Sequence, residues 1–296
     1  MIRIGLVDFD TSHVIAFTER LNHINVPASE YVAGARVVAG CPGDSLMMPE
    51  RIPPYAKQLA NYGIRLVSKP EELLGDIDAV MIESQQGARH LMRSKPFLEA
   101  GLPTFVDKPF AETVAQADAM IRLAARCHAP LMSCSALRYA PEVIDAVQKT
   151  RELGPIIGAD VWTTATLHPG NPGLLHYGIH GVEMLYTLLG AGCARVRCTS
   201  TADADLVVGS WRDGRNGTVR GIRKGAPGFG FVAHYEKGRY TASVEGSAYY
   251  REMLRTIVGM FTTKRPPYDV RVSREIIAFI SAARRSAASG GGPRSL

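Results

Sequence analysis

The chain has 296 residues, of which 46% are hydrophobic and 21% are charged, and its formal net charge at pH 7 is +6. This composition is that of a folded globular protein and excludes a disordered chain. The lysines and arginines are scattered, without a dense basic run, so we expect no nucleic-acid partner. No apolar stretch reaches the roughly 18 residues of a membrane span, and the five cysteines form no C-x-x-C pair. We therefore expect a cytoplasmic protein with reduced thiols and no membrane partner.

Short apolar segments alternate with amphipathic segments over the first part of the chain. Strands are predicted at 2–9, 35–41, 64–68, 78–83, 104–107 and 131–135, and helices lie between several of them, notably from Thr11 or Ser12 to His23, at 88–100 and at 113–127. Apolar strands that alternate with helices form parallel βαβ units. The sequence thus predicts an α/β fold whose N-terminal domain, residues 1–137, is a doubly wound parallel sheet of Rossmann type.

The second half has a different pattern. Strand-like segments occur at 157–165, 195–201, 206–211, 218–223, 229–236 and 240–245, and turn signals such as Asn216-Gly217 separate the later ones. Helices are expected from Pro141 to about 153, at 247–262 and at 273–287. This pattern predicts a C-terminal α+β domain on an antiparallel sheet over residues 138–289, followed by a flexible tail at 290–296.

Two groups of polar residues stand where a parallel sheet and a helix would present them to a ligand. Lys108 follows the strand at 104–107, and ligands of open α/β sheets bind beyond the carboxyl ends of the strands. His176, His180 and Glu183 recur at helical spacing, about 100° round the helix from an apolar stripe. Both groups are candidate catalytic or ligand-binding residues.

These same segments resemble a known family. Asp107-Lys108-Pro109 is similar to the Glu-Lys-Pro signature of the Gfo/Idh/MocA family of nicotinamide-dependent sugar and cyclitol dehydrogenases. Residues 177–190 resemble the family's Gly-x-His-x-x-Asp helix, which ends in Leu-Leu-Gly. The resemblance implies an oxidoreductase that uses NAD or NADP, a carbohydrate-like substrate and a homo-oligomer. It also implies that Lys108 polarises the substrate oxygen, that His180 relays the proton and that His176 positions the substrate, without a metal.

The first strand–helix turn departs from the family pattern. The three glycine positions of the dinucleotide fingerprint G-x-G-x-x-G are held by Asp8, Asp10 and His13. Carboxylates there oppose a pyrophosphate, so we expect weak dinucleotide binding. The resemblance still implies a cofactor site built from this turn and from the loops after the fourth and fifth strands, namely Phe9, Asp10, Thr11, Ser12, His13, Ser84, His90 and Asp107.

Other functions stay open at this point. A family member with a degenerate dinucleotide site can use His176, His180 and Glu183 as ligands of a divalent metal, in a lyase or hydrolase acting on a carbohydrate. A non-catalytic sugar-binding protein is a further alternative. The Asp8-x-Asp10 pair after the first strand also resembles the start of the haloacid-dehalogenase phosphotransferases, which bind Mg²⁺ there. Asp10 can also have a purely structural role, in which its side chain caps the helix that follows.

Overall fold

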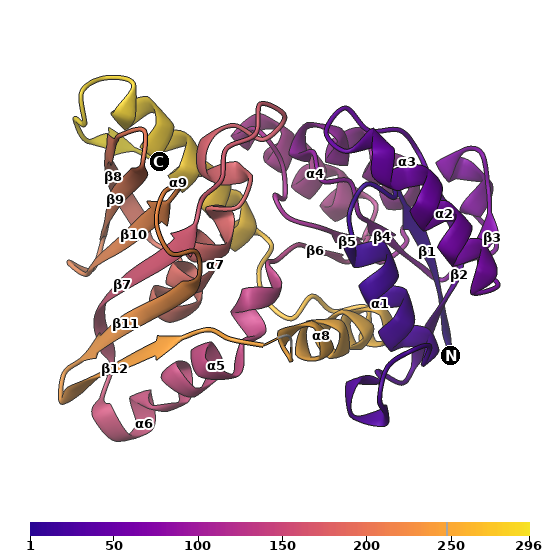
Figure 1. Ribbon diagram of the computed structural model, residues 1–296, viewed down its shortest axis with the longest axis horizontal. Helices are drawn as coiled ribbons and strands as arrows, with labels where there is room; N and C mark the ends of the chain where they lie inside the picture. The colour runs from indigo at the N-terminus through magenta and orange to yellow at the C-terminus, as the bar shows by residue number, and fades with distance from the viewer. Residues whose placement is uncertain (247) are drawn as a thin grey trace. The chain divides into compact units, whose positions relative to one another are not determined.

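A computed structural model describes residues 1–246 and 248–296 and divides the chain into two compact units. The first unit comprises Met1–Cys134 and Tyr250–Val270, and the second comprises Ser135–Tyr249 and Arg271–Leu296. The sequence assigned residues 250–270 to the second domain. They belong to the first unit because helix α8 (Tyr249–Thr263) packs beside α1 (His13–Asn22), with the rings of Tyr250 and Phe17 5.6 Å apart (Figure 1).

The first unit is built on a six-stranded sheet in which every neighbouring pair is parallel. Its strands are β1 (Ile2–Val7), β2 (Ala35–Cys41), β3 (Arg65–Leu66), β4 (Ala79–Ile82), β5 (Thr104–Val106) and β6 (Leu131–Met132). They lie in the order β3-β2-β1-β4-β5-β6, which is the strand order of dinucleotide-binding Rossmann sheets. The predicted doubly wound sheet is confirmed.

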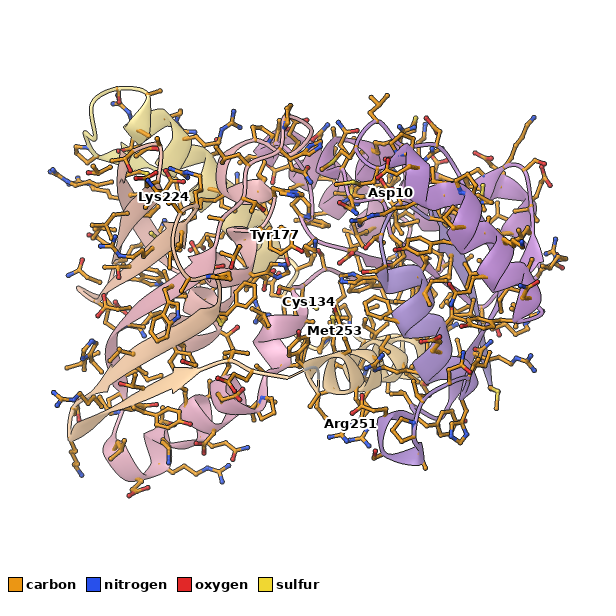
Figure 2. The ribbon with its side chains drawn as sticks, viewed as in Figure 1. Asp10, Cys134, Tyr177, Lys224, Arg251 and Met253 are labelled. Carbon is orange, nitrogen blue, oxygen red and sulfur yellow. The ribbon has the colours of Figure 1, made fainter. Side chains whose placement is uncertain are left out.

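Helices and single turns connect these strands. The helices besides α1 and α8 are α2 (Ile52–Asn61), α3 (His90–Glu99) and α4 (Val114–Arg126), and the 3-10 turns are η1 (Ala28–Glu30), η2 (Pro49–Arg51), η3 (Pro70–Leu73) and η4 (Gly87–Arg89). The sequence did not predict α2, which contains Pro53 and Pro54. Both prolines lie in its first turn, where a helix tolerates the missing N–H. On α8, Met253 is buried and Arg251 donates to the carbonyl oxygen of Ser29 at 2.8 Å (Figure 2).

The second unit is built on a seven-stranded sheet. Its strands are β7 (Ile156–Thr164), β8 (Cys193–Ser200), β9 (Ala204–Trp211), β10 (Asn216–Ile222), β11 (Phe229–Tyr235), β12 (Gly238–Ser243) and β13 (Arg294–Ser295), in the order β12-β11-β7-β10-β9-β8-β13. The sheet is mixed rather than antiparallel throughout, because β10 inserts beside β7 in parallel orientation. The predicted flexible tail is also wrong in part: Arg294 pairs with Val196 at the β8 edge, whose backbone groups would otherwise lack strand partners.

Helices α7 and α9 pack on this second sheet. The helical elements of the unit are η5 (Ala136–Tyr139), α5 (Pro141–Gln148), α6 (Thr150–Leu153), η6 (Gly173–Leu175), α7 (Ile179–Leu189) and α9 (Arg271–Ala287). Helix α7 approaches β7 closely at Gly181, where a Cβ would stand 2.6 Å from Cγ2 of Thr163. In the described part of the chain, no helix combines the length and the apolarity that crossing a bilayer requires.

Helix α4 follows the loop that contains Asp107 and Lys108 (the lysine loop), and it begins with a capping box. The hydroxyl of Thr113 accepts a hydrogen bond from the N–H of Gln116, and the N–H of Thr113 donates to the Gln116 side chain, both at 3.2 Å. We expect Thr113→Ala to lower the free energy of unfolding by about 1 kcal/mol, measured by urea denaturation. Thr113→Ser keeps the hydroxyl and should recover most of this loss. Equal losses in both variants would show that the cap is not the cause.

Candidate functional site

The carboxyl ends of β1, β4 and β5 open on one edge of the first sheet. These three strands are parallel, and β4 lies between β1 and β5. The turn after β1, the segment that begins at Glu83 and the lysine loop at Asp107–Lys108 therefore meet at this edge. Lys108 thus lies at the end of its strand, where ligands of open α/β sheets bind.

Asp8 stands at the first glycine position of the fingerprint, in a left-handed backbone conformation, and turns its carboxylate inward. Its φ is 65°, in the left-handed region that Asp tolerates better than most residues. The carboxylate fills the space beside Gly43, where a Cβ would come within 1.8 Å of Oδ1. Oδ2 accepts from Arg93 Nε at 2.9 Å and from the Ser84 hydroxyl. Burial raises the pKa of Asp8 to about 6, although Arg93 and Ser84 oppose the shift.

Asp10 is also engaged within the protein. Its Oδ1 accepts the N–H of Gln85 at 3.0 Å, and its Oδ2 accepts the hydroxyl of Ser45 at 2.6 Å. The side chain is 1% exposed and ties the turn after β1 to the segments after β4 and β2. Asp10 is therefore neither a helix cap nor a free carboxylate aimed at the helix start, and the expected opposition to a pyrophosphate is reduced because hydrogen bonds already hold this charge.

The start of α1 is not capped by its N-cap residue. Ser12 is at the N-cap position, but its side chain makes no capping hydrogen bond, and the first turn carries no acidic residue. Thr11 accepts the N–H of His13 at 3.3 Å, whereas Phe9 is fully buried with its ring against Gly40. Ser12 thus leaves this helix start uncapped, and its first-turn N–H groups other than that of His13 fit an anion such as a phosphate. Phe9 belongs to the core and presents no side chain to a cofactor.

Two expected cofactor residues in the β4 loop are used for internal bonding. His90 is fully buried, with Nε2 2.7 Å from the carbonyl oxygen of Ser84 and Nδ1 3.3 Å from that of Phe110. Burial lowers the pKa of His90, although the hydrogen bonds to these carbonyl groups oppose the shift. Ser84 donates its hydroxyl to Asp8. These side chains join the loops after β4 and β5, and their burial argues against direct contact with a cofactor.

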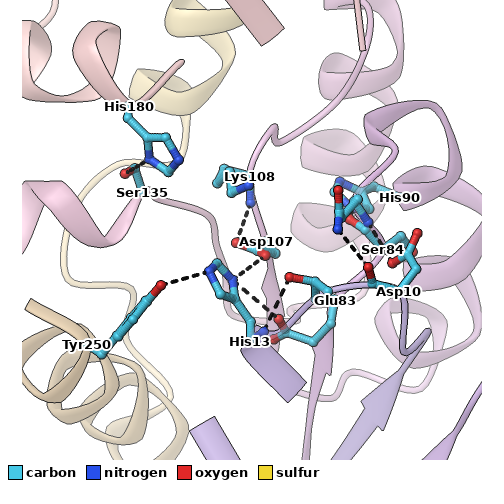
Figure 3. Close-up of polar contacts among 12 residues, drawn as sticks. Asp10, His13, Glu83, Ser84, His90, Asp107, Lys108, Ser135, His180 and Tyr250 are labelled. Carbon is cyan, nitrogen blue, oxygen red and sulfur yellow. Dashed lines mark hydrogen bonds and ion pairs between the residues drawn. The ribbon is translucent and has the colours of Figure 1, made fainter. Parts of the chain in front are cut away.

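His13, Glu83 and Asp107 converge at the sheet edge (Figure 3). His13 Nδ1 lies 2.7 Å from Oδ2 of Asp107 and 4.0 Å from Oε2 of Glu83. Burial and the neighbouring Asp107 raise the pKa of Glu83 well above its usual value. Burial acts in the same direction on Asp107, but His13 and Lys108 together outweigh it and hold the pKa of Asp107 below its usual value. The chain thus concentrates two carboxyl groups and an imidazole in a buried space.

His176, His180 and Glu183, which were predicted to form one stripe on a helix (the histidine stripe), do not lie on one helix in the structure. His176 precedes α7, in the turn after η6, so it does not share a helix with His180. Glu183 is 2% exposed, and its Oε2 accepts from Arg138 Nη2 at 3.0 Å. His180 Nδ1 lies 2.6 Å from the hydroxyl of Ser135. A metal site of His176, His180 and Glu183 is not supported, because an arginine already neutralises the carboxylate.

The Asp8-x-Asp10 phosphotransferase alternative fails on the same ground. Asp8 is paired with Arg93, and the one group of metal-ligating side chains found among the described residues contains neither Asp8 nor Asp10.

Sequence reasoning missed the roles of Glu83, Arg93 and Tyr250. Glu83 directly follows the buried strand β4, as Asp107 follows β5, and this shared position is a signal that the two carboxylates lie at one sheet edge. Tyr250 Oη lies 3.4 Å from His13 Nε2, and no sequence signal links residues so far apart along the chain. Arg93 also bridges Asp8 to Asp44, which follows β2.

The buried Asp8 carboxylate gives stability a defined pH dependence. Its pKa is raised from 3.8 to about 6, so the folded state binds the proton more tightly, and stability decreases as pH rises through this window. Asp8→Asn removes this titration. At about 1.4 kcal/mol per unit, we expect the stability of the variant relative to wild type to rise by up to roughly 3 kcal/mol between pH 4 and pH 7, measured by urea unfolding.

Asp44→Asn is the matched control, since Asp44 shares Arg93 but its pKa is lowered by the hydrogen bond to Arg89. The stability of Asp44→Asn relative to wild type should therefore fall as pH rises. If the stability difference between Asp8→Asn and wild type does not change with pH, the raised pKa of Asp8 is contradicted.

Comparisons with known proteins agree with this geometry. Residues 49–134 match the model of the oxidoreductase family with an NAD-binding Rossmann fold, Gfo/Idh/MocA. UDP-N-acetylglucosamine 3-dehydrogenase from Acidithiobacillus ferrooxidans is 28% identical over 178 residues, which span 56% of this chain and 54% of that protein. The match therefore spans about half the length of this relative.

Solved structures share the fold of the whole chain. Myo-inositol dehydrogenase from Lactobacillus casei, in complex with NAD(H) and myo-inositol, has a TM-score of 0.82 at 15% identity and covers 100% of this chain and 97% of its own. Scyllo-inositol dehydrogenase from Lactobacillus casei, with bound NAD(H) and scyllo-inositol, has a TM-score of 0.82 at 13% identity and covers 100% and 99%. Asp107-Lys108-Pro109 and residues 177–190 indicated a resemblance to the Gfo/Idh/MocA oxidoreductase family, and this resemblance is confirmed. Residues 49–134 carry the family's sequence pattern, and the whole chain has its fold.

Proposed function

We propose that the chain is an NAD(H)-dependent oxidoreductase that transfers a hydride between a secondary alcohol of a sugar or cyclitol and the nicotinamide. The observation that carries the proposal is the parallel sheet of dinucleotide-binding order whose β5 ends in the lysine loop, within the segment that matches an NAD-binding family. The inositol dehydrogenases and the sugar-nucleotide dehydrogenase among its relatives support an alcohol of this class.

The start of α1 is the proposed anion-binding part of the cofactor site. Its first-turn N–H groups other than that of His13 suit a pyrophosphate, and Thr11, Ser12 and His13 form this turn. Asp8 and Asp10 stay out of the phosphate path because each carboxylate is bonded to its own partners. When bound, the nicotinamide ring supplies or accepts the hydride.

The chain's own residues handle the hydroxyl group of the substrate. We assign Lys108 to hold and polarise the substrate oxygen, since an ammonium group stabilises developing negative charge there. His180 relays the hydroxyl proton, a role for which histidine is the commonest side chain in proteins. Its Nδ1 contact with Ser135 orients the ring. His176 is proposed to position the substrate.

Two broader properties accompany this proposal. All five cysteines are free, which supports a reducing compartment such as the cytoplasm. The family resemblance is the basis for expecting a homo-oligomer.

The chemical role of Lys108 is testable by substitution. We expect Lys108→Met to lower kcat by about 10²- to 10⁴-fold on a polyol that the wild type oxidises, with little change in the thermal midpoint. Lys95→Met, which removes a lysine 61% exposed on α3, is the matched control and should retain activity. If Lys108 and His180 serve one step, Lys108→Met combined with His180→Gln should cost much less than the product of the two single effects. Full activity in Lys108→Met would remove the assignment.

The cofactor site is testable at Ser12 by fluorescence titration with NADH and NADPH. Ser12→Asp places a carboxylate at the helix start and should weaken dinucleotide binding at least about fivefold, from a repulsion of about 1 kcal/mol or more at 4 Å. Ser12→Asn supplies a neutral cap of the same size and should have a smaller effect. If the wild type binds neither nucleotide, the oxidoreductase proposal fails and a sugar-binding protein becomes the better hypothesis.

A further inference from the structure

The buried side chains of His13, Glu83 and Asp107 bring one imidazole and two carboxyl groups together in the first unit. His13 is the first residue of α1, Glu83 directly follows β4, and Asp107 directly follows β5, so three separate elements of the first unit deliver one side chain each. One ligand atom from each residue lies within 4.8 Å of the other two. All three side chains are buried.

Glu83 provides an independent indication of a ligand. Its side chain is 0% exposed, and neither carboxylate oxygen has a hydrogen-bond partner among the described residues. Buried polar groups in proteins are nearly always hydrogen-bonded, because an unpartnered group keeps the full cost of its desolvation. The carboxylate lies next to His13 (Figure 3), so a ligand between the two would satisfy it.

The donor atoms and their spacing fit a metal ion. Distances of 2.7 Å and 4.0 Å from His13 Nδ1 to the two carboxylate oxygens bracket the roughly 3–4 Å between neighbouring ligands whose bonds to the metal are about 2.0–2.2 Å. One imidazole and two carboxylates suit ions such as Zn²⁺ and Mn²⁺. Two carboxylates also balance the charge of a divalent cation.

The surrounding contacts orient these donors. Asp107 Oδ1 accepts the N–H of Lys108 at 2.7 Å, which leaves Oδ2 directed at His13. On the far side of the imidazole, Nε2 faces the hydroxyl of Tyr250 at 3.4 Å. Such outer contacts fix the tautomer and the orientation of a metal-binding histidine. The arrangement is therefore supported on both sides of the ring.

We propose that His13 Nδ1, Glu83 Oε2 and Asp107 Oδ2 form a binding site for one divalent transition-metal ion of the Zn²⁺ or Mn²⁺ type. Three protein ligands leave at least one coordination position for water or for an oxygen atom of a bound molecule. The ion replaces the direct contact between His13 and Asp107. It also places positive charge next to the turn that carries Asp8 and Asp10. This site goes beyond the proposed hydride transfer and differs from the histidine site rejected above.

The test uses tag-free protein dialysed against a chelator, without nucleotide or substrate. Zn²⁺ and Mn²⁺ are titrated separately by calorimetry, and the metal retained after desalting is measured by elemental analysis. We expect one equivalent of at least one of the two ions and a rise in thermal midpoint on binding. Retention of neither ion, with no change in midpoint, would overturn the proposal.

Glu83→Gln keeps the size of the side chain and removes its charge. It should weaken metal binding at least about tenfold, since losing a ligand costs no less than losing one of its outer contacts. Without metal it should be no less stable than wild type, because the change removes an unpartnered buried carboxylate. Asp107→Asn serves as a second ligand variant if Glu83→Gln does not fold.

His234→Ala is the matched control for casual metal binding. His234 Nε2 lies 2.9 Å from Asp160 Oδ2, in an exposed histidine–aspartate pair on the second unit. This variant should bind metal as the wild type does. Loss of metal in His234→Ala but not in Glu83→Gln would contradict the proposed ligands. NADH titration of the metal-free protein tests the oxidoreductase proposal separately, so either proposal can fail while the other stands.

Discussion

The parallel pairing of β1, β4 and β5 is the constraint on which the candidate site depends. Parallel strands in register end at the same edge, so the residues that follow them are brought together even though 75 residues separate Asp10 from Gln85 and 94 separate His13 from Asp107. Here those residues are acidic. The fold thus collects carboxyl groups at the edge where a ligand is expected, and the surrounding side chains must stabilise them.

The structure stabilises these carboxyl groups in three ways. Asp8 is paired with Arg93, and Asp10 is held by the N–H of Gln85 and the hydroxyl of Ser45. Asp107 has the imidazole of His13. Glu83 alone, among the carboxyl groups described at this edge, has neither a hydrogen bond nor an ion pair shorter than 4.0 Å. The turn after β1, which the sequence predicted to oppose an anion, is therefore largely neutralised by its own neighbours, and Glu83 is the carboxyl group left without a hydrogen bond.

Sequence patterns predicted the strands of both sheets except β13, and the placement of Lys108 at a strand end, because apolar periodicity and chain order determine these. The parallel pair of β7 and β10 was not predicted, since local pattern does not encode which strands become neighbours. The histidine stripe was predicted as one helix, but the chain turns between His176 and Ile179. Partners such as Arg138 for Glu183 come from distant segments, so charge neutralisation inside the site could not be read from spacing.

The return of residues 250–270 to the first unit affects how the protein can be made and divided. Buried side chains of α8, including Leu254, Ile257 and Phe261, complete the apolar packing of a unit whose other residues end at Cys134. During synthesis the ribosome must therefore finish most of the second unit before the first can close its core. A fragment that stops near residue 134 leaves the apolar surface beside α1 open to water, so cutting the gene at the apparent domain boundary does not yield a self-sufficient nucleotide-binding module.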